Sequence, residues 1–301
     1  MNAAHRFSEE PFIVQPGETL DLSRRSTQAG NELKDKAHGV EELAHDVSAL
    51  QAAQQLLYAS DSPSLLVILQ GMDAAGKDGT IRHVMGGVNP QGCRVYSFKA
   101  PNAAELEHHF LARAVPCLPA RGMISLFNRS YYEEVLVVRV HPEFLLPQKL
   151  PQLTALRPKA LDKLWQRRYR EINAFERSLA SHGTLILKFM LHVSANEQRG
   201  RLLERLQKPE KNWKFNAGDL EERKLWPQYQ FAFEQALTHT STKWAPWYVI
   251  PADNKWYARA AIADITAARL EGLGLRYPTV PQSEQVHFAE YARQLQAEDV
   301  T

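Results

Sequence analysis

The sequence contains only two cysteines, Cys93 and Cys117, and neither belongs to a CxxC pair or a Cys/His cluster. This excludes a disulfide framework and a zinc site of ordinary spacing, and isolated thiols are typical of a reducing compartment. No apolar run approaches the roughly 18 residues of a membrane-spanning helix, and the first residues lack the apolar stretch of a signal peptide. We therefore expect a cytoplasmic protein with no membrane partner.

The chain also lacks an even spread of charge. Residues 1–64 carry 5 basic and 10 acidic residues, whereas residues 157–214 carry 14 basic and 6 acidic residues, a net charge of +8. The whole chain has a net charge of only +2. The basic segment favours a surface that meets a polyanion, and a solvated helix face is the alternative interpretation.

Internal repeats are absent, and the chain alternates between two kinds of segment. Apolar runs predict buried strands at residues 64–70, 94–98, 123–127, 184–193 and 247–251. Apolar periodicity and capping signals predict helices at residues 40–57, 102–115, 159–181, 194–206, 219–240 and 254–270, and another after Gly79. Pro227 should kink or divide the helix at residues 219–240.

Strands that alternate with helices predict one three-layer α/β/α domain with a parallel central sheet. We expect this domain to span residues 39–273. A polar N-terminal arm at residues 1–38 would precede it, and a C-terminal extension at residues 274–301 would follow.

Residues 71–80, GMDAAGKDGT, satisfy the pattern GxxxxGK directly after a predicted strand and before a predicted helix. In this context the loop's N–H groups and the helix N-terminus cradle phosphates, and Lys77 reaches the transferred phosphate. The alternative is a strand–turn–helix connection with a coincidental lysine. The predicted phosphate and nucleotide contacts here are Gly71, Ala74, Ala75, Gly76, Asp78, Gly79, Thr80 and Arg82.

The loop departs from the common pattern at two acids. Asp78 stands where most such loops carry a Ser or Thr that binds magnesium. Asp73 lies inside the loop, where a carboxylate would repel phosphate unless a cation intervened. We therefore predict that Asp73 binds magnesium or orients the incoming phosphate. A loop-stabilising Asx turn is the alternative role.

A second candidate group follows the strand predicted at residues 123–127. Because ligands bind beyond the carboxyl ends of strands in open α/β sheets, Asn128 and Arg129 should face the same cleft as the phosphate loop. Arg129 can clamp a transferring phosphoryl group. Glu133 and Glu134 begin the next helix, and one of them is a candidate metal ligand. Lys99 and Arg139 are further candidate phosphate contacts, with surface ion pairs as the alternative.

Six cations follow the strand predicted at residues 184–193. In P-loop kinases the segment at this place commonly closes over the phosphates as a lid, here at about residues 199–218. The cations exceed what one nucleotide requires and suit a long phosphate chain. They are Arg199, Arg201, Arg205, Lys208, Lys211 and Lys214.

Four segments together resemble the family-2 polyphosphate kinases: residues 71–80, 127–133, 208–215 and 241–253. The resemblance covers roughly residues 40–270. It implies a thymidylate-kinase-like P-loop kinase fold and reversible phosphoryl transfer between inorganic polyphosphate and AMP, ADP and ATP, with GMP and GDP as alternative acceptors. It also implies magnesium, with manganese as the alternative ion, and homo-oligomers, either dimers or tetramers.

The same resemblance assigns roles to particular residues. It makes Asp73 and Lys77 the loop acid and lysine, Arg129 the phosphate clamp and residues 205–214 the lid. Many relatives carry Asp at the position of Asn128 and a neutral residue at that of Glu133. The pattern found here is similar to the subgroup that acts on both AMP and ADP, and it suggests Asp73 and Glu133 as metal ligands.

Two other functions compete with this one. An ATP-dependent nucleoside-monophosphate kinase would share the loop, but Asp78 and the excess of lid cations argue against it. A non-catalytic nucleic-acid binder could stack bases on Trp213 and Phe215 between the lysines. Such a binder gains nothing from Asp73 beside a phosphate, so we expect no nucleic-acid partner.

Overall fold

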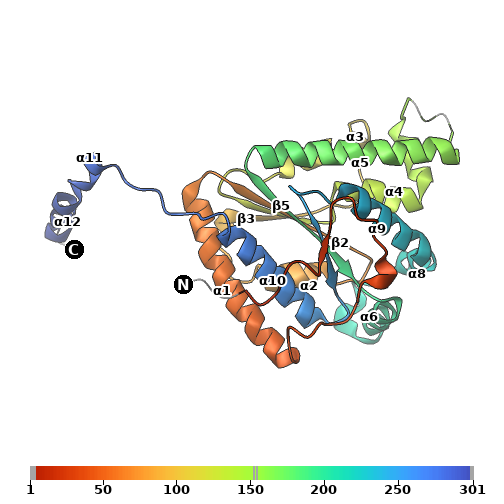
Figure 1. Ribbon diagram of the computed structural model, residues 1–301, viewed down its shortest axis with the longest axis horizontal. Helices are drawn as coiled ribbons and strands as arrows, with labels where there is room; N and C mark the ends of the chain where they lie inside the picture. Colours follow the sequence, from red (N-terminus) through yellow and green to blue (C-terminus); the bar gives the residue numbers. More distant parts are fainter. Residues whose placement is uncertain (1–4, 152, 154, 299–301) are drawn as a thin grey trace.

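The computed structural model describes residues 5–298 except 152 and 154 and contains one central sheet (Figure 1). Its six strands lie in the order β1-β6-β5-β2-β4-β3. The strands are β1 (Ile13–Val14), β2 (Ser64–Gly71), β3 (Cys93–Ser97), β4 (Ile124–Asn128), β5 (Thr184–His192) and β6 (Trp247–Pro251). Strands β2 to β6 pair in parallel, and β1 adds an antiparallel edge to β6. The parallel core of the sheet is as predicted.

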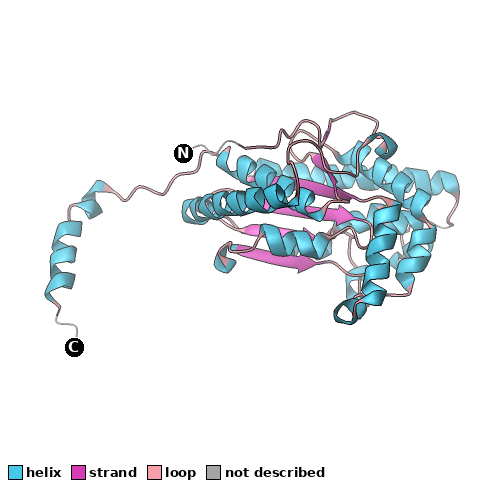
Figure 2. Ribbon diagram, turned by 90° about the horizontal axis from the view of Figure 1, so that it is seen from below, coloured by secondary structure: helices cyan, strands magenta, loops and turns pink. Residues whose placement is uncertain are grey.

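Helices cover both faces of the sheet, which gives the three predicted layers (Figure 2). One layer contains α1 (Lys36–Ser60), α2 (Lys77–Val84) and α10 (Lys255–Glu271). The other contains α4 (Val137–Val140), α5 (Pro158–Ser181) and α9 (Trp226–Thr240). Central strand residues 65–69 are at most 2 % exposed, so the apolar runs read from the sequence form the core.

Shorter helices complete the chain. The α-helices are α3 (Ala103–Leu106), α6 (Ala195–Gln207), α7 (Pro209–Asn212), α8 (Gly218–Lys224), α11 (Gln282–Gln285) and α12 (Phe288–Ala297). The 3₁₀ helices are η1 (Leu22–Arg24), η2 (Pro90–Gly92), η3 (Ala112–Cys117), η4 (Tyr131–Val135) and η5 (Pro142–Gln148).

Two helix predictions had different outcomes. The helix predicted at residues 219–240 is divided into α8 and α9, and Pro227 lies in the first turn of α9, as its missing N–H requires. The helix predicted at residues 102–115 is wrong. Asn102 and Glu105 do form the expected capping box, but α3 ends at Leu106 and the chain continues to the 3₁₀ helix η3.

The N-terminal arm is an integral part of the core. Phe7, Phe12 and Val14 are at most 4 % exposed, and β1 hydrogen-bonds to β6. The buried carboxylate of Asp264 on α10 accepts a hydrogen bond from the Phe7 N–H at 3.0 Å. The arm's polar composition did not indicate this packing, because its few apolar residues have no helix or strand period.

The C-terminal extension leaves the domain. Residues 275–298 carry α11 and α12 away from the body of the molecule (Figure 1). The side chains of Phe288, Tyr291 and Leu295 on α12 are 51–67 % exposed. None of the described helices is long and apolar enough to cross a membrane.

Candidate active site

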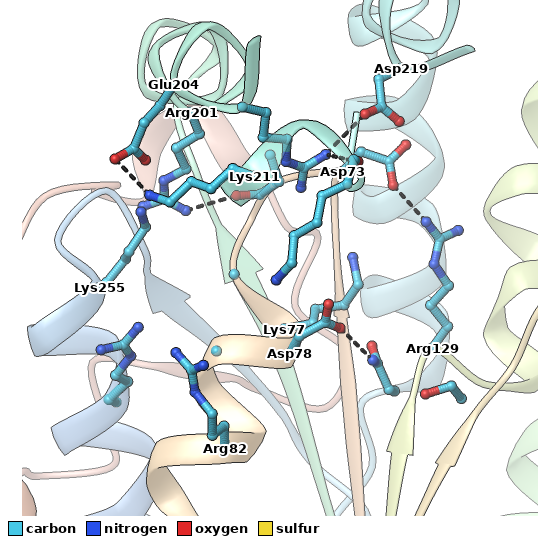
Figure 3. A pocket seen from close by; sticks show the side chains of 18 of the residues that line it. Asp73, Lys77, Asp78, Arg82, Arg129, Arg201, Glu204, Lys211, Asp219 and Lys255 are labelled. Carbon is cyan, nitrogen blue, oxygen red and sulfur yellow. Dashed lines mark hydrogen bonds and ion pairs between the residues drawn. The ribbon is translucent and has the colours of Figure 1, made fainter. Parts of the chain in front are cut away.

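A cavity of about 600 Å³ opens at the carboxyl edge of the sheet (Figure 3). The phosphate loop, the end of β4, helix α6, the lid and α10 all contribute to its walls. The predicted site residues that line it are Asp73, Ala74, Gly76, Lys77, Asp78, Gly79, Arg82, Lys99, Asn128, Arg129, Arg201, Arg205, Lys211 and Lys214. The structure therefore brings most of the predicted residues into one place.

Glycine is required at the base of this loop. Gly76 has φ +113°, a backbone conformation that side chains with a Cβ rarely adopt. This turn places the N-terminus of α2 and Lys77 at the cavity. The ammonium group of Lys77 donates to the carbonyl oxygens of Gly71 at 2.7 Å and Met72 at 3.2 Å. Burial, aided by the nearby Arg129 guanidinium, lowers the pKa of Lys77 to about 8.

The unusual Asp78 has a partner that the sequence did not reveal. The Asn128 side-chain amide at the end of β4 donates to Asp78 Oδ1 at 2.7 Å. A carboxylate at position 128 would be repelled by Asp78 at this distance, whereas an amide can donate to it. Asp78 departs from the common phosphate-loop pattern and Asn128 from the residue of many relatives, and the hydrogen bond between them explains why they occur together.

Arg129 lies between two carboxylates. Its guanidinium contacts Asp73 Oδ1 at 2.5 Å and Glu133 Oε2 at 3.1 Å. The amide of Gln70 donates to the other oxygen of Glu133 at 2.9 Å. Arg129 has φ +62°, an uncommon conformation for a residue with a side chain and one that is often found at functional sites.

The neighbouring acid has a different environment. Glu134 is buried and pairs with Arg168 of α5 at 3.0 Å. Sequence reasoning left open which of Glu133 and Glu134 has a role at the site, and in the structure Glu133 is the one that contacts Arg129 of the cleft wall. Behind them Glu176 accepts from the Tyr131 and Tyr132 hydroxyls at 2.9 and 2.8 Å. These contacts anchor η4 to α5.

Arg201 differs from the other lid cations. It is 6 % exposed, and its guanidinium donates to the backbone oxygens of Ala74, Ala75, Ala252 and Asp253 at 2.5–3.0 Å. Its Nε donates to Glu197 at 2.8 Å. These contacts favour a structural role that joins the phosphate loop to the end of β6. A polyphosphate contact for Arg201 remains a prediction.

Three of the other lid cations are held by acids. Arg205 pairs with Asp219 at 3.0 Å, and Lys208 and Lys211 both bind Glu204, at 2.6 and 2.7 Å. Hydrogen bonds from these two lysines lower the pKa of Glu204 to about 2. An incoming polyanion would therefore have to replace these ion pairs.

Several predicted residues do not line this cavity. Arg139 is the clearest difference, because its guanidinium donates to the Tyr169 hydroxyl at 2.7 Å and stacks over Trp165 and Phe231. Successive residues of a helix point about 100° apart, so Arg139 faces α5 and α9 whereas Val137 and Val138 face another cavity. Gly71, Ala75, Thr80, Glu133, Arg199 and Lys208 are also absent from the lining.

The sequence analysis missed six residues of the lining: Ser97, Phe98, Glu204, Asp219, Lys255 and Arg259. Lys255 and Arg259 lie four residues apart on α10, just after the carboxyl end of β6. Ligands bind beyond the carboxyl ends of the strands in open α/β sheets, and this rule predicted the position of Arg129. It also applies to Lys255 and Arg259.

A second cavity of about 480 Å³ adjoins the first and is mainly apolar. Phe98, Lys99 and Arg129 belong to the walls of both cavities. Its remaining walls include Leu106, Val137, Val138, Phe144 and Glu133. A charged cleft thus meets an apolar pocket at Arg129.

The chain is similar in sequence to known proteins. Residues 33–273 match the family described as Polyphosphate kinase 2 (PPK2). The chain belongs to the PPK2 family. It is 46 % identical over 290 residues to the ADP-polyphosphate phosphotransferase of Rhodopseudomonas palustris, covering 96 % of this chain and 99 % of that protein. It is 48 % identical over 268 residues to the AMP/ADP-polyphosphate phosphotransferase of Meiothermus ruber, covering 89 % and 94 %.

A solved structure supports the fold of this PPK2 chain. The crystal structure of Polyphosphate Kinase 2 from Arthrobacter aurescens is similar with a TM-score of 0.84 and 38 % identity, covering 96 % of both chains. The predicted α/β P-loop kinase fold is therefore confirmed.

PPK2 phosphotransferases generally depend on a divalent metal ion, and the residues present fit one. The carboxylates of Asp73 and Glu133 converge on one position, which the Arg129 guanidinium occupies. Hard oxygen donors are the ligands that Mg²⁺ prefers. Among the described residues, the only cluster of three potential ligands is Glu42, His45 and Asp46 on α1. Asp73 and Glu133 are the carboxylates that would hold such an ion.

Proposed function

We propose that this PPK2 chain catalyses reversible phosphoryl transfer between inorganic polyphosphate and nucleoside mono- and diphosphates, with AMP and ADP as acceptors. The observation that carries the proposal is the charge of the first cavity. Of its 20 lining residues, ten are Lys or Arg and four are Asp or Glu. This excess of positive charge matches a phosphate chain better than a single nucleotide.

The relatives' activities support the same substrates. The proteins of Rhodopseudomonas palustris and Meiothermus ruber are named for ADP and for both AMP and ADP, respectively, with polyphosphate as the second substrate. Because both resemble nearly the whole chain at almost equal identity, we propose the dual acceptor range. The ATP-dependent monophosphate kinase is not favoured.

The two cavities suggest how the substrates meet. Polyphosphate would lie in the charged cleft between the phosphate loop and the lid, and the nucleoside would enter the apolar pocket beside Phe98. Arg129 belongs to both walls, so it can hold the phosphoryl group as it passes between donor and acceptor. In such a transfer the protein forms no covalent bond to the phosphoryl group. Positioning and charge neutralisation would therefore supply most of the rate acceleration.

Lys77 and the acids have complementary roles in this mechanism. The Lys77 ammonium would exchange its contacts with the carbonyls of Gly71 and Met72 for phosphate oxygens. Asp73 and Glu133 would hold Mg²⁺, which neutralises phosphate charge when bound. The guanidinium of Arg129, which lies between these two carboxylates, would contact the transferred group.

The assembly and location are further parts of the proposal. The exposed apolar side chains of Phe288, Tyr291 and Leu295 support a homo-oligomer, which light scattering after gel filtration would measure. Cys93 and Cys117 are free thiols, consistent with a cytoplasmic location.

The direct test is nucleotide turnover on purified protein with magnesium. AMP and ADP are each compared with and without polyphosphate, and EDTA replaces magnesium in a parallel series. We expect polyphosphate-dependent ATP formation from ADP, conversion of AMP as well, and loss of both with EDTA. The Lys77→Ala variant should be inactive, whereas Lys243→Ala, which removes an exposed lysine outside the cleft, should match wild type.

Two results would contradict the proposal. Phosphorylation of a monophosphate by ATP, together with no response to polyphosphate, would identify a conventional nucleotide kinase. Equal turnover by Lys77→Ala and wild type would contradict the role of the phosphate loop.

A further inference from the structure

The lid does not hold all of the positive charge in the basic segment. A separate groove of about 480 Å³ lies at the N-terminal end of α5. Its lining has four cations, Arg157, Lys159, Lys163 and Arg167, together with apolar residues such as Leu153 and Leu164. Among the residues that the structure describes, no acid lines it, and none of its lining residues belongs to the catalytic cleft.

Most cations of the groove are not neutralised by an ion pair within the described part of the chain. Arg167 pairs with Glu171 at 3.6 Å. Within residues 5–298, leaving aside 152 and 154, Arg157, Lys159 and Lys163 have no ion-pair partner. The N-terminus of a 24-residue helix adds positive potential, and no side chain in the described part of the chain caps it. Unpaired cations around a concave surface are suited to a polyanion.

The position of the groove connects it to the reaction. Helix α5 leads into the amino end of β5, so its own N-terminus lies at the carboxyl edge of the sheet, where the catalytic cleft opens. In Figure 1 this end of α5 lies on the same side of the molecule as α6 and α8.

Neighbouring hollows join the two sites. The nucleoside pocket borders the cleft at Arg129, and a small cavity shares Gln148 with that pocket and Arg167 with the α5 groove. These shared wall residues place the α5 groove two hollows away from the cleft, within the reach of a polymer of several hundred phosphates.

We propose that the α5 groove is a second polyphosphate-binding site, an anchor for long chains distant from the reacting phosphate. This inference rests on the proposed function. A chain held at the groove keeps its free end at a high local concentration near the cleft, as any two-site attachment does. A short chain that fills only the cleft gains nothing from the anchor.

The test compares chain lengths. The variant Lys159→Gln/Lys163→Gln removes two exposed charges from the groove, and Arg170→Gln/Lys243→Gln removes two exposed charges that do not line it. KM is measured for tetrapolyphosphate and for chains of several hundred phosphates. The groove variant should raise KM about tenfold for long chains. Its KM for tetrapolyphosphate and both KM values of the control variant should stay at the wild-type level.

Other outcomes overturn the anchor. These are an unchanged KM for long chains, an equal rise for both chain lengths, or an equal rise in the control variant. Fluorescence anisotropy with end-labelled long polyphosphate, recorded without nucleotide, measures the polyphosphate affinity of wild type and groove variant independently of turnover. A wild-type protein that turns over no polyphosphate would refute the proposed function. Polyphosphate binding that the groove variant weakens would still support the site, and tighter binding of RNA than of polyphosphate would refute it.

Discussion

Replacing Arg201 by alanine should destabilise the whole domain. The guanidinium joins two loops, because it donates to Ala74 and Ala75 of the phosphate loop and to Ala252 and Asp253 after β6. All four oxygens would lose a charged donor in a place that is nearly closed to water, since Arg201 is only 6 % exposed.

The magnitude follows from these contacts. A hydrogen bond to a charged group contributes about 1.5–3 kcal/mol, and bonds that share one side chain are not additive. We therefore expect the free energy of unfolding to fall by about 4 kcal/mol, as is usual when one partner of a buried charged network is removed. For a chain of this size, that loss corresponds to a fall in Tm of about 5–10 °C.

The assay is thermal and urea unfolding of Arg201→Ala beside Arg199→Ala. Arg199 is two residues away on the same helix and exposed, and it donates to the neutral side chain of Asn196 at 2.7 Å. Its loss should change the free energy of unfolding by at most about 0.5 kcal/mol. A Tm of Arg201→Ala equal to wild type, together with weaker polyphosphate binding, would refute the structural role and make Arg201 a substrate contact.

Four other predictions follow from charged side chains. Because Lys77 must be protonated to bind phosphate and its pKa is about 8, kcat/KM for polyphosphate should fall as pH rises through about 8, and a flat profile would be inconsistent with this role. Since the same pKa is lower in the folded protein than the 10.5 of a free lysine, the unfolded chain binds more protons between these values. The free energy of unfolding should therefore rise with pH across this window, and Lys77→Met should reduce that slope in urea titrations. Arg129→Ala should lower kcat about 10³-fold, and Arg129→Lys should restore little because an ammonium cannot clamp two oxygens; wild-type kcat in Arg129→Lys would disprove the clamp. Lys188→Met leaves the buried Glu176 without the ammonium group 2.6 Å away, so the free energy of unfolding should fall by about 3–5 kcal/mol. Adding Glu176→Gln to this variant should restore part of that stability. Additive losses in that double variant would argue against the pair.

The features predicted correctly were those encoded by neighbouring residues. The phosphate loop places glycine, lysine and helix start within ten residues, so its local order alone defines the cradle. Arg129 followed from the end of β4 by the same logic. The pairing of Asp78 with Asn128 could not be inferred, because it joins residues 50 positions apart through the register of β2 and β4.

Side-chain direction caused the other differences. Arg139 is near the site in sequence, but its place in the short helix α4 turns it toward Tyr169. Arg201 has the sequence spacing of a lid cation. It is buried because its guanidinium contacts the backbone at Ala252, after strand β6. In both cases the decisive neighbour belongs to a distant segment, which no local pattern encodes.

The packing of the N-terminal arm has a consequence for how the protein is made. Phe7 is anchored to Asp264, Tyr248 donates to Glu9 at 2.7 Å, and β1 has its strand partner in β6. Each of these partners is synthesised more than 230 residues later. At about 5–20 residues per second, the apolar side chains of the arm stay without their native contacts for roughly 10–50 s on the ribosome. The apolar residues of the arm are thus translated long before the partners that bury them, and chaperones that bind short apolar segments should act there.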